Sequence, residues 1–448
     1  MKYKTAPAEL GTENIGKLLR QYAVPAIIAM TASSLYNITD SIFIGHGVGP
    51  LALSGLAICF PLMNLAAAFG SLVGVGGSTL LSIRLGQKDY ATGNQILGNV
   101  LVLNFIIGLA FSGLTLLFLN PILYFFGASE DTLFHARQYM EILLLGNVFT
   151  HIYMGLNTLL RSSGSPEKSM YATIATVLIN VGLNALFVFG LNWGIRGSAC
   201  ATIIAQVVVL TWQFKFFNNP NYIIHFKKGI FRLKKKIVSD MLSIGSAPFF
   251  MNAAACLIVI VINQGLLRTG GDLAVGAYGI VNRIAFLFIM VVIGLNQGMQ
   301  PIAGYNFGAK LYDRVSIVLK KTILYATLIM TFGFAFVELF PRVVVSIFTT
   351  DENLIDLAVN GLRIVFIIYP FVGFQMVTSN FFQSIGMAGK AIFLSLSRQL
   401  IFLLPCLLIL PNFYGVNGIW LSFPISDSIA CIVALGLLMR QMRSFKNA

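Results

Sequence analysis

The chain has 448 residues, of which 57% are apolar and only 10% are charged, and its net charge is +14. Soluble domains carry about 25% charged residues, so this composition excludes a soluble globular protein, and the apolar excess also excludes a disordered chain. The apolar residues are numerous enough for about twelve membrane-spanning helices of about 20 residues each.

Twelve apolar segments follow one another along the chain, and each is long enough to cross a membrane as a helix. They lie at 18–44, 51–82, 92–119, 135–161, 169–190, 197–218, 238–267, 273–305, 317–340, 355–385, 390–411 and 416–439. Outer-membrane strands would be about 10 residues long with strict alternation, which these segments lack. Because lipid demands internal backbone hydrogen bonding, we expect an all-α polytopic membrane protein with twelve transmembrane helices.

Lysine and arginine are concentrated in alternate connections between these segments. The N-terminus, every second loop and the C-terminus together hold 23 of the 30 basic residues, whereas the opposite loops hold only 4. Loops rich in Lys and Arg stay in the cytoplasm, so we expect both termini on the cytoplasmic side. Membrane topology thus accounts for the net charge, and nucleic acid is not an expected partner.

The two halves of the chain resemble each other at a spacing of 222 residues; for example, residues 86–90 fall on residues 308–312. Each half contains six segments, so the repeats are parallel and related by a pseudo-two-fold axis along the membrane normal. Such repeats occur in secondary transporters, with the binding site near the repeat interface. We expect an N-lobe at 1–218, a basic cytoplasmic linker at 219–237 and a C-lobe at 238–448.

Several other chemistries lack the residues that they need. No GxxxxGK[ST] phosphate loop occurs, so uphill transport would have to use an ion gradient. The five cysteines form no CxxC pair, and the four histidines are not spaced with carboxylates as in a catalytic or metal site. We therefore expect no enzyme activity, no cofactor and no structural metal.

Four of the 16 acidic residues fall inside apolar segments, and Asp40 is the strongest functional candidate among them. It lies about 33 Å along the first helix, in its outer half. A carboxylate there is costly unless it is paired, hydrated or protonated, so Asp40 is a candidate proton carrier. The alternative is a carboxylate whose hydrogen bonds only fix helix packing.

Polar side chains of other first-half segments are expected at a similar depth. Asn180 and Asn184 are four residues apart and share one helix face. With Tyr139 and Thr202 they complete a candidate cation or proton site around Asp40, although each alone is also explained by polar packing between helices. The second half has Ile262 or Asn263 at the repeat position of Asp40, so it offers amides in place of a carboxylate. The candidate substrate cavity comprises Tyr36, Asn37, Asn157, Asn263, Gln297 and Gln300.

Four motifs in order carry a resemblance to a known family. Residues 35–45 (LYNITDSIFIG), 161–164 (RSSG), 300–310 (QPIAGYNFGAK) and 415–427 (GVNGIWLSFPISD) resemble motifs of multidrug and toxic compound extrusion (MATE) transporters. The resemblance covers nearly the whole chain, and it is strongest to the prokaryotic DinF-like branch.

This resemblance implies two six-helix lobes around a central cleft, with export driven by H⁺ or Na⁺. It implies a cation or proton site at Asp40 with partners at Tyr139, Asn180, Asn184 and Thr202, and it places Asn157 in the cavity wall. Related members carry aspartate where this chain has Asn184, which leaves one carboxylate. We therefore expect H⁺ as the coupling ion, with Na⁺ at Asp40 as the alternative.

The combined expectation is a monomeric antiporter in a bacterial or archaeal cytoplasmic (inner) membrane. Its substrates would be amphipathic, cationic small molecules or drugs. Two other transport functions stay open: a Na⁺-coupled drug antiporter, and a flippase for a lipid or lipid-linked precursor. Arg283 and Arg398, two cations within the spans, keep the flippase alternative open.

Overall fold

The computed structural model describes residues 9–446, and no β-strand forms within that range. Eleven of the described helices are long and apolar enough to cross a membrane, or twelve if one bent pair counts as a single span. The expected all-α, twelve-span membrane fold is therefore confirmed. Several helices begin or end a few residues beyond the apolar segments, because polar residues continue the helix past its apolar part.

The N-lobe contains the first six spans. They are α2 (Ile15–Gly47), α3 (Pro50–Gly86), α4 (Tyr90–Leu117), α6 (Glu130–Ser162), α7 (Pro166–Asn184) with the π-helical continuation η1 (Ala185–Gly190), and α8 (Gly194–Phe217). Two short helices accompany them, α1 (Glu9–Thr12) before the first span and α5 (Leu119–Phe125) after the third. Caps mark the boundaries: the Asp89 side chain accepts a hydrogen bond from Thr92 N and begins α4.

The C-lobe contains the last six spans. They are the two parts of α9 (Lys235–Gly308), α10 (Tyr312–Leu339), α12 (Glu352–Phe366) with α13 (Tyr369–Ser384), α14 (Ala388–Leu396) with η2 (Ser397–Leu403) and α15 (Leu404–Ile409), and α17 (Val416–Lys446). The short helices α11 (Pro341–Ser346) and α16 (Pro411–Tyr414) lie in connections. Helix α9 turns back at Gly271, whose φ of 66° and ψ of −165° separate its two spans. Helices α12 and α13 meet at 55°, where Pro370 prevents one continuous helix.

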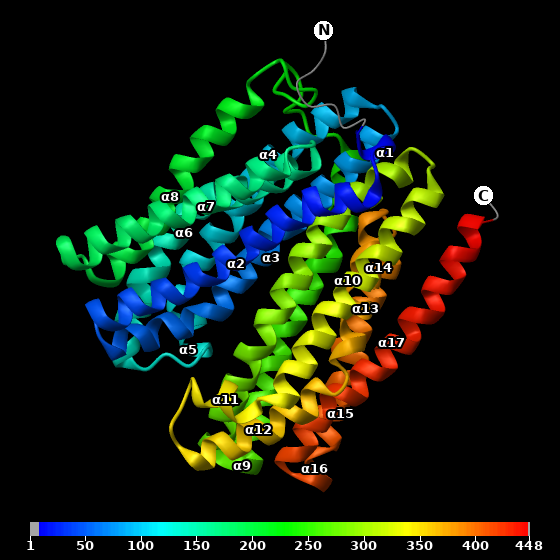
Figure 1. The fold of residues 1–448 in the computed structure, drawn as a ribbon. Coiled ribbons are helices and arrows are strands. Elements are labelled where there is room, and N and C mark those ends of the chain that lie inside the picture. Colours follow the sequence, from blue (N-terminus) through cyan, green and yellow to red (C-terminus); the bar gives the residue numbers. More distant parts are fainter. Residues whose placement is uncertain (1–8, 447–448) are drawn as a thin grey trace.

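The two lobes form a V in Figure 1: they meet near α1 and diverge toward the opposite end. Helix α3 packs against α9 at the meeting end without side chains between the backbones. A Cβ atom on Gly76 would lie 2.0 Å from Met241 O, and one on Gly245 would lie 1.7 Å from Leu72 O. Glycine at these positions therefore permits the close approach of the lobes.

The connection between the lobes runs from the end of α8 at Phe217 to the start of α9 at Lys235. Residues 235–237, which were expected to end the linker at 219–237, belong instead to the first turn of α9. A separate cluster of buried apolar side chains, which includes Ile44, Cys59, Tyr139 and Ala199, fills the far end of the N-lobe. Asp40 lies one turn before Ile44 on α2, so this cluster adjoins the candidate site.

Candidate functional site

Asp40 is buried inside the N-lobe, with only 5% of its surface exposed. Its Oδ1 accepts a hydrogen bond of 2.7 Å from Nδ2 of Asn184. Asn184 is the last residue of α7, where the helix widens into η1. An acid away from water requires such a donor, because an unsatisfied buried charge is expensive. The partner is a neutral amide, so the carboxylate has no counter-charge in this bond.

A chain of hydrogen bonds continues from Asp40 through three helices. Asn184 Nδ2 also donates to Asn180 Oδ1 at 2.9 Å, and Asn180 Nδ2 donates to Thr202 Oγ1 at 3.2 Å. The hydroxyls of Tyr36 and Thr202 are 2.9 Å apart. The α-helical spacing of four residues places Asn180 and Asn184 on one face, opposite α2 and α8. The structure thus brings together four of the five residues that the sequence predicts for this site.

The site has one carboxylate and several oxygen atoms. Tyr36 and Ser198 also lie close enough to Asp40 to interact with its carboxylate, but Ser198 Oγ makes no hydrogen bond among the described residues. The Oδ1 atom of Asn184 is buried and has no hydrogen-bond partner among the described residues. No three His, Cys, Asp or Glu side chains within residues 9–446 are grouped as in a metal centre. This arrangement suits a proton or a weakly bound monovalent cation at Asp40.

The remaining first-half candidates occupy different positions. Tyr139 on α6 is buried and close enough to Asp40 and Tyr36 to interact with them electrostatically. Asn157 belongs to another contact, in which its Nδ2 donates to Thr173 Oγ1 at 3.0 Å. Asn37 lies on α2, but its side chain is outside the part of the chain that the structure describes. Ser198 was missed, although its place one turn before Thr202 on the same helix was a usable signal.

Two of the predicted cavity residues connect the lobes in this conformation. Gln297 Oε1 accepts a 2.6 Å hydrogen bond from Arg161 at the end of α6. Gln300 is 3% exposed, and its Nε2 donates to Ser78 Oγ at 2.9 Å and to Thr79 Oγ1 at 2.6 Å. Asn263, the third candidate from α9, is half-buried. The sequence offered no signal for the contact of Arg161 with Gln297, because it depends on how the lobes dock.

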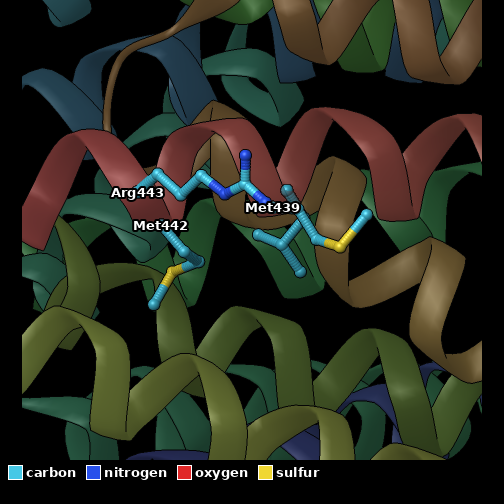
Figure 2. Close-up of a pocket in the computed structure, with 4 residues that line it drawn as sticks. Met439, Met442 and Arg443 are labelled. Carbon is cyan, nitrogen blue, oxygen red and sulfur yellow. The ribbon is translucent and has the colours of Figure 1, made fainter.

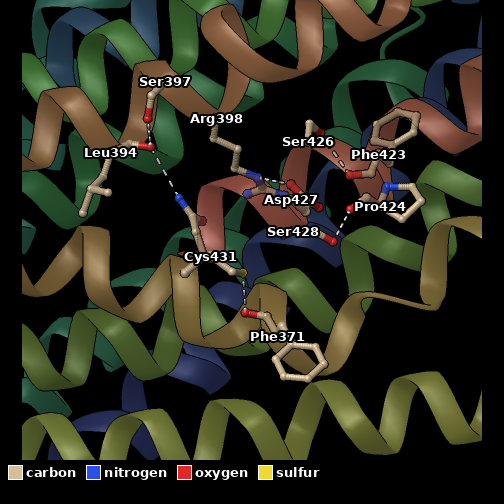
Figure 3. Close-up of polar contacts among 11 residues, drawn as sticks. Phe371, Leu394, Ser397, Arg398, Phe423, Pro424, Ser426, Asp427, Ser428 and Cys431 are labelled. Atoms are coloured by element: carbon tan, nitrogen blue, oxygen red, sulfur yellow. Dashed lines mark hydrogen bonds and ion pairs between the residues drawn. The ribbon is translucent and has the colours of Figure 1, made fainter. Parts of the chain in front are cut away.

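A second intramembrane acid, Asp427 on α17, is bound to a cation. Arg398 on η2 donates through Nε to Asp427 Oδ1 at 2.6 Å and through a terminal nitrogen to Oδ2 at 3.2 Å, as Figure 3 shows. Cys431, one turn further along α17, donates to the Phe371 carbonyl at 3.3 Å. Arg398 is therefore neutralised inside the C-lobe. Arg283, the other cation on which the flippase alternative rests, is exposed.

A cavity of about 260 Å³ lies against the last turns of α17, far along the chain from the polar cluster. Figure 2 shows Met439, Met442 and Arg443 around it, and Leu438 completes the lining. This lining contains no acid and no residue of the N-lobe. The cavity is thus separate from the Asp40 site.

Comparisons with known proteins agree on one family. The family model described as MatE matches residues 25–186 and 248–408, which fall in the two halves of the chain. The multidrug export protein MepA of Staphylococcus haemolyticus is 25% identical over 422 residues, which cover 94% of this chain and 93% of that protein. MepA of Staphylococcus aureus strain MW2 is also 25% identical, over 94% of this chain and 92% of the relative.

Solved structures agree with this assignment. The MATE multidrug transporter DinF-BH, solved in complex with rhodamine 6G, is 36% identical and superimposes with a TM-score of 0.90 over 97% of this chain and 98% of its own. A MATE family transporter in an outward-facing conformation has the same fold, with a TM-score of 0.93, 23% identity and complete coverage of both chains.

Proposed function

Because this chain belongs to the MatE family of membrane transporters, we propose that it is a multidrug exporter driven by protons. Its proposed substrates are amphipathic, cationic small molecules. The names of the MepA relatives and the rhodamine 6G complex of DinF-BH support this substrate class. The family consists of transporters rather than enzymes.

The observation that carries the proton proposal is the burial of a single carboxylate beside a neutral amide. A proton that enters from the outside binds Asp40 and removes its charge. The hydrogen bond from Asn184 to a charged acceptor then becomes an ordinary, weaker one. The weaker bond holds α2 less tightly against α7, so the N-lobe can change shape. Export of a cation in exchange for this proton follows as alternating access of the two lobes.

The contact between the lobes defines which side is closed. Gln297 and Gln300 of α9 bind the N-lobe at the end of the molecule where α1 lies. The concentration of Lys and Arg supports a cytoplasmic position for that end and for both termini. We infer that the protein is a monomer in the cytoplasmic membrane of a bacterium or archaeon. This conformation would then be open to the outside.

Sodium coupling is the second candidate, and one observation favours it. The unpartnered Asn184 Oδ1 beside the Asp40 carboxylate adds a neutral oxygen ligand of the type that hard cations prefer. The flippase alternative has less support, because Asp427 already neutralises Arg398.

The test is transport of rhodamine 6G by the purified protein in liposomes, under a pH gradient with the outside acidic or under a Na⁺ gradient. Asp313→Asn, which changes an exposed acid near the start of α10, is the matched control for Asp40→Asn. We expect transport with the pH gradient alone, and its loss only in Asp40→Asn. Transport driven by Na⁺ alone would overturn proton coupling. No movement of this dye or other organic cations with either gradient would overturn drug export.

A further inference from the structure

The connection between the lobes, residues 218–234, is held on the N-lobe by two asparagines; we call it the strap. Asn94 of α4 accepts a 2.8 Å hydrogen bond from His225 N, and its Nδ2 lies 3.4 Å from Ile223 O. Asn99 donates to Arg232 O at 3.1 Å and accepts from Lys234 N at 2.9 Å. Both asparagines are buried, so the strap has a fixed face toward the lobe.

Apolar and aromatic contacts complete this inner face. Ile224 and Ile230 are buried against the N-lobe. A Cβ atom on Gly98 would lie 2.2 Å from Ile230 O, so the backbone of the strap touches α4 directly. Lys168 donates to the Tyr222 hydroxyl at 2.6 Å and lies 4.5 Å from the centre of its ring. The inner face of the strap is thus occupied by its contacts with the N-lobe.

The outer face combines positive charge with exposed apolar side chains. Phe231 is 48% exposed and Leu233 is 43% exposed, on either side of Arg232. The exposed cations of the strap and of the first turn of α9 are Lys227, Lys228, Arg232, Lys234, Lys235 and Lys236. We call these six cations with Phe231 and Leu233 the basic face.

The basic face has little compensating negative charge. No Asp or Glu occurs in the sequence between Glu167 and Asp240. Asp89 interacts electrostatically with Lys234, but its carboxylate also caps α4. Asp240 lies one turn after Lys236 and makes no ion pair with it in the described chain. None of the ion pairs within residues 9–446 includes a cation of the basic face.

We propose that the basic face binds the headgroups of anionic phospholipids. The strap joins the ends of two membrane spans, α8 and α9, and therefore lies where lipid headgroups are. Lysine and arginine next to a span attract anionic lipid, and exposed Phe and Leu side chains enter the boundary of the acyl chains. A soluble polyanion would use the charges but leave Phe231 and Leu233 in water. This inference is independent of which substrate or ion the protein transports.

The test measures the preference of the full-length protein for lipids, without any transport. The purified protein is placed in phosphatidylcholine bilayers with spin-labelled phosphatidylglycerol or spin-labelled phosphatidylcholine, and electron paramagnetic resonance gives the motionally restricted fraction of each. Each lysine at an anionic surface contributes about 1 kcal/mol, so we expect a preference of roughly fivefold or more for phosphatidylglycerol. The triple variant K234Q/K235Q/K236Q should lose most of it.

Two matched variants make the result specific. K88Q/K310Q/K320Q removes the same number of exposed charges elsewhere on the chain and should retain the preference. K234R/K235R/K236R keeps the charge and should also retain it. Phe231→Ser with Leu233→Ser should reduce the preference while leaving the net charge unchanged. Equal loss in the two glutamine variants would overturn the assignment to the basic face. Complete competition by inorganic phosphate at matched ionic strength would show a soluble-anion site instead of a lipid surface.

Discussion

Asp40 and Asp427 are both acids inside the membrane, but their partners differ. Asp40 accepts a hydrogen bond from the amide of Asn184, whereas Asp427 accepts two from the guanidinium of Arg398. A carboxylate beside a neutral amide gains or loses a proton without separating an ion pair. An acid held by arginine must break that pair first, which makes proton exchange at Asp427 more costly. The difference favours Asp40 as the proton site.

We predict that Arg398→Met destabilises the protein strongly. It leaves Asp427 buried without its partner, a change that costs about 3–5 kcal/mol in proteins. Thermal unfolding in detergent should show a large drop in the melting temperature. The double variant R398M/D427L, which removes both charges, should recover most of that loss. A double variant as unstable as R398M would contradict the interpretation of this pair.

The sequence predicted part of the polar cluster, for reasons of helix geometry. The spacing of Asn180 and Asn184 and the depth of Asp40 and Thr202 were enough to expect these side chains together, and the structure joins them. The pairing of Arg398 with Asp427 was not predicted. It depends on the rotation of two helices about their axes, which hydrophobic segments alone do not fix. The transport role of the cluster stays a prediction.

At the scale of elements, the first turn of α4 depends on Asp89. Partial burial would raise the pKa of this carboxyl, but hydrogen bonds from Thr92 and the charges of Arg84 and Lys234 together hold the pKa below its ordinary value of 3.8. A carboxyl with a lower pKa in the folded state stabilises the fold above its unfolded pKa. That contribution is lost as the pH falls through the folded pKa.

We therefore predict that Asp89→Ala lowers stability at neutral pH by about 1 kcal/mol, the usual value of an N-cap. The difference in the free energy of unfolding between the variant and the native chain should shrink as the pH falls below the ordinary carboxyl pKa of 3.8. Asp89→Asn, which keeps an acceptor oxygen without the charge, should retain much of the cap but not its pH dependence. Thermal unfolding at several pH values measures this. A stability difference that grows in acid would contradict the assignment of a lowered pKa to Asp89.

The contact of α3 with α9 gives the second prediction for an element. A methyl group at Gly245 would lie 1.7 Å from Leu72 O, so Gly245→Ala should push the lobes apart at the end near α1. Overpacking of this kind costs about 1–3 kcal/mol. Spin labels on the two lobes at that end should show longer distances by pulsed resonance. Gly436→Ala on α17, where a methyl group meets nothing within 4 Å, is the control. Equal distances in both variants would contradict this role of Gly245.

At the scale of the whole molecule, the internal repeat and the apolar segments predicted the architecture. Twelve spans in two lobes follow from the length of the segments and from their even number in each half, and the family match agrees. The docking of the lobes was not predictable in this way. The hydrogen bonds of Gln297 and Gln300 to the N-lobe belong to one conformation, and the same side chains were expected to line a cavity.

The most direct measurement for the central claim is proton release when substrate binds. Purified protein in weakly buffered detergent receives rhodamine 6G, and a pH-sensitive dye reports released protons. If Asp40 exchanges its proton for a cationic substrate, the native chain and Asp313→Asn should release protons when rhodamine 6G is added, and Asp40→Asn should release none while it remains folded. Equal release by folded Asp40→Asn would contradict the claim that Asp40 couples export to protons.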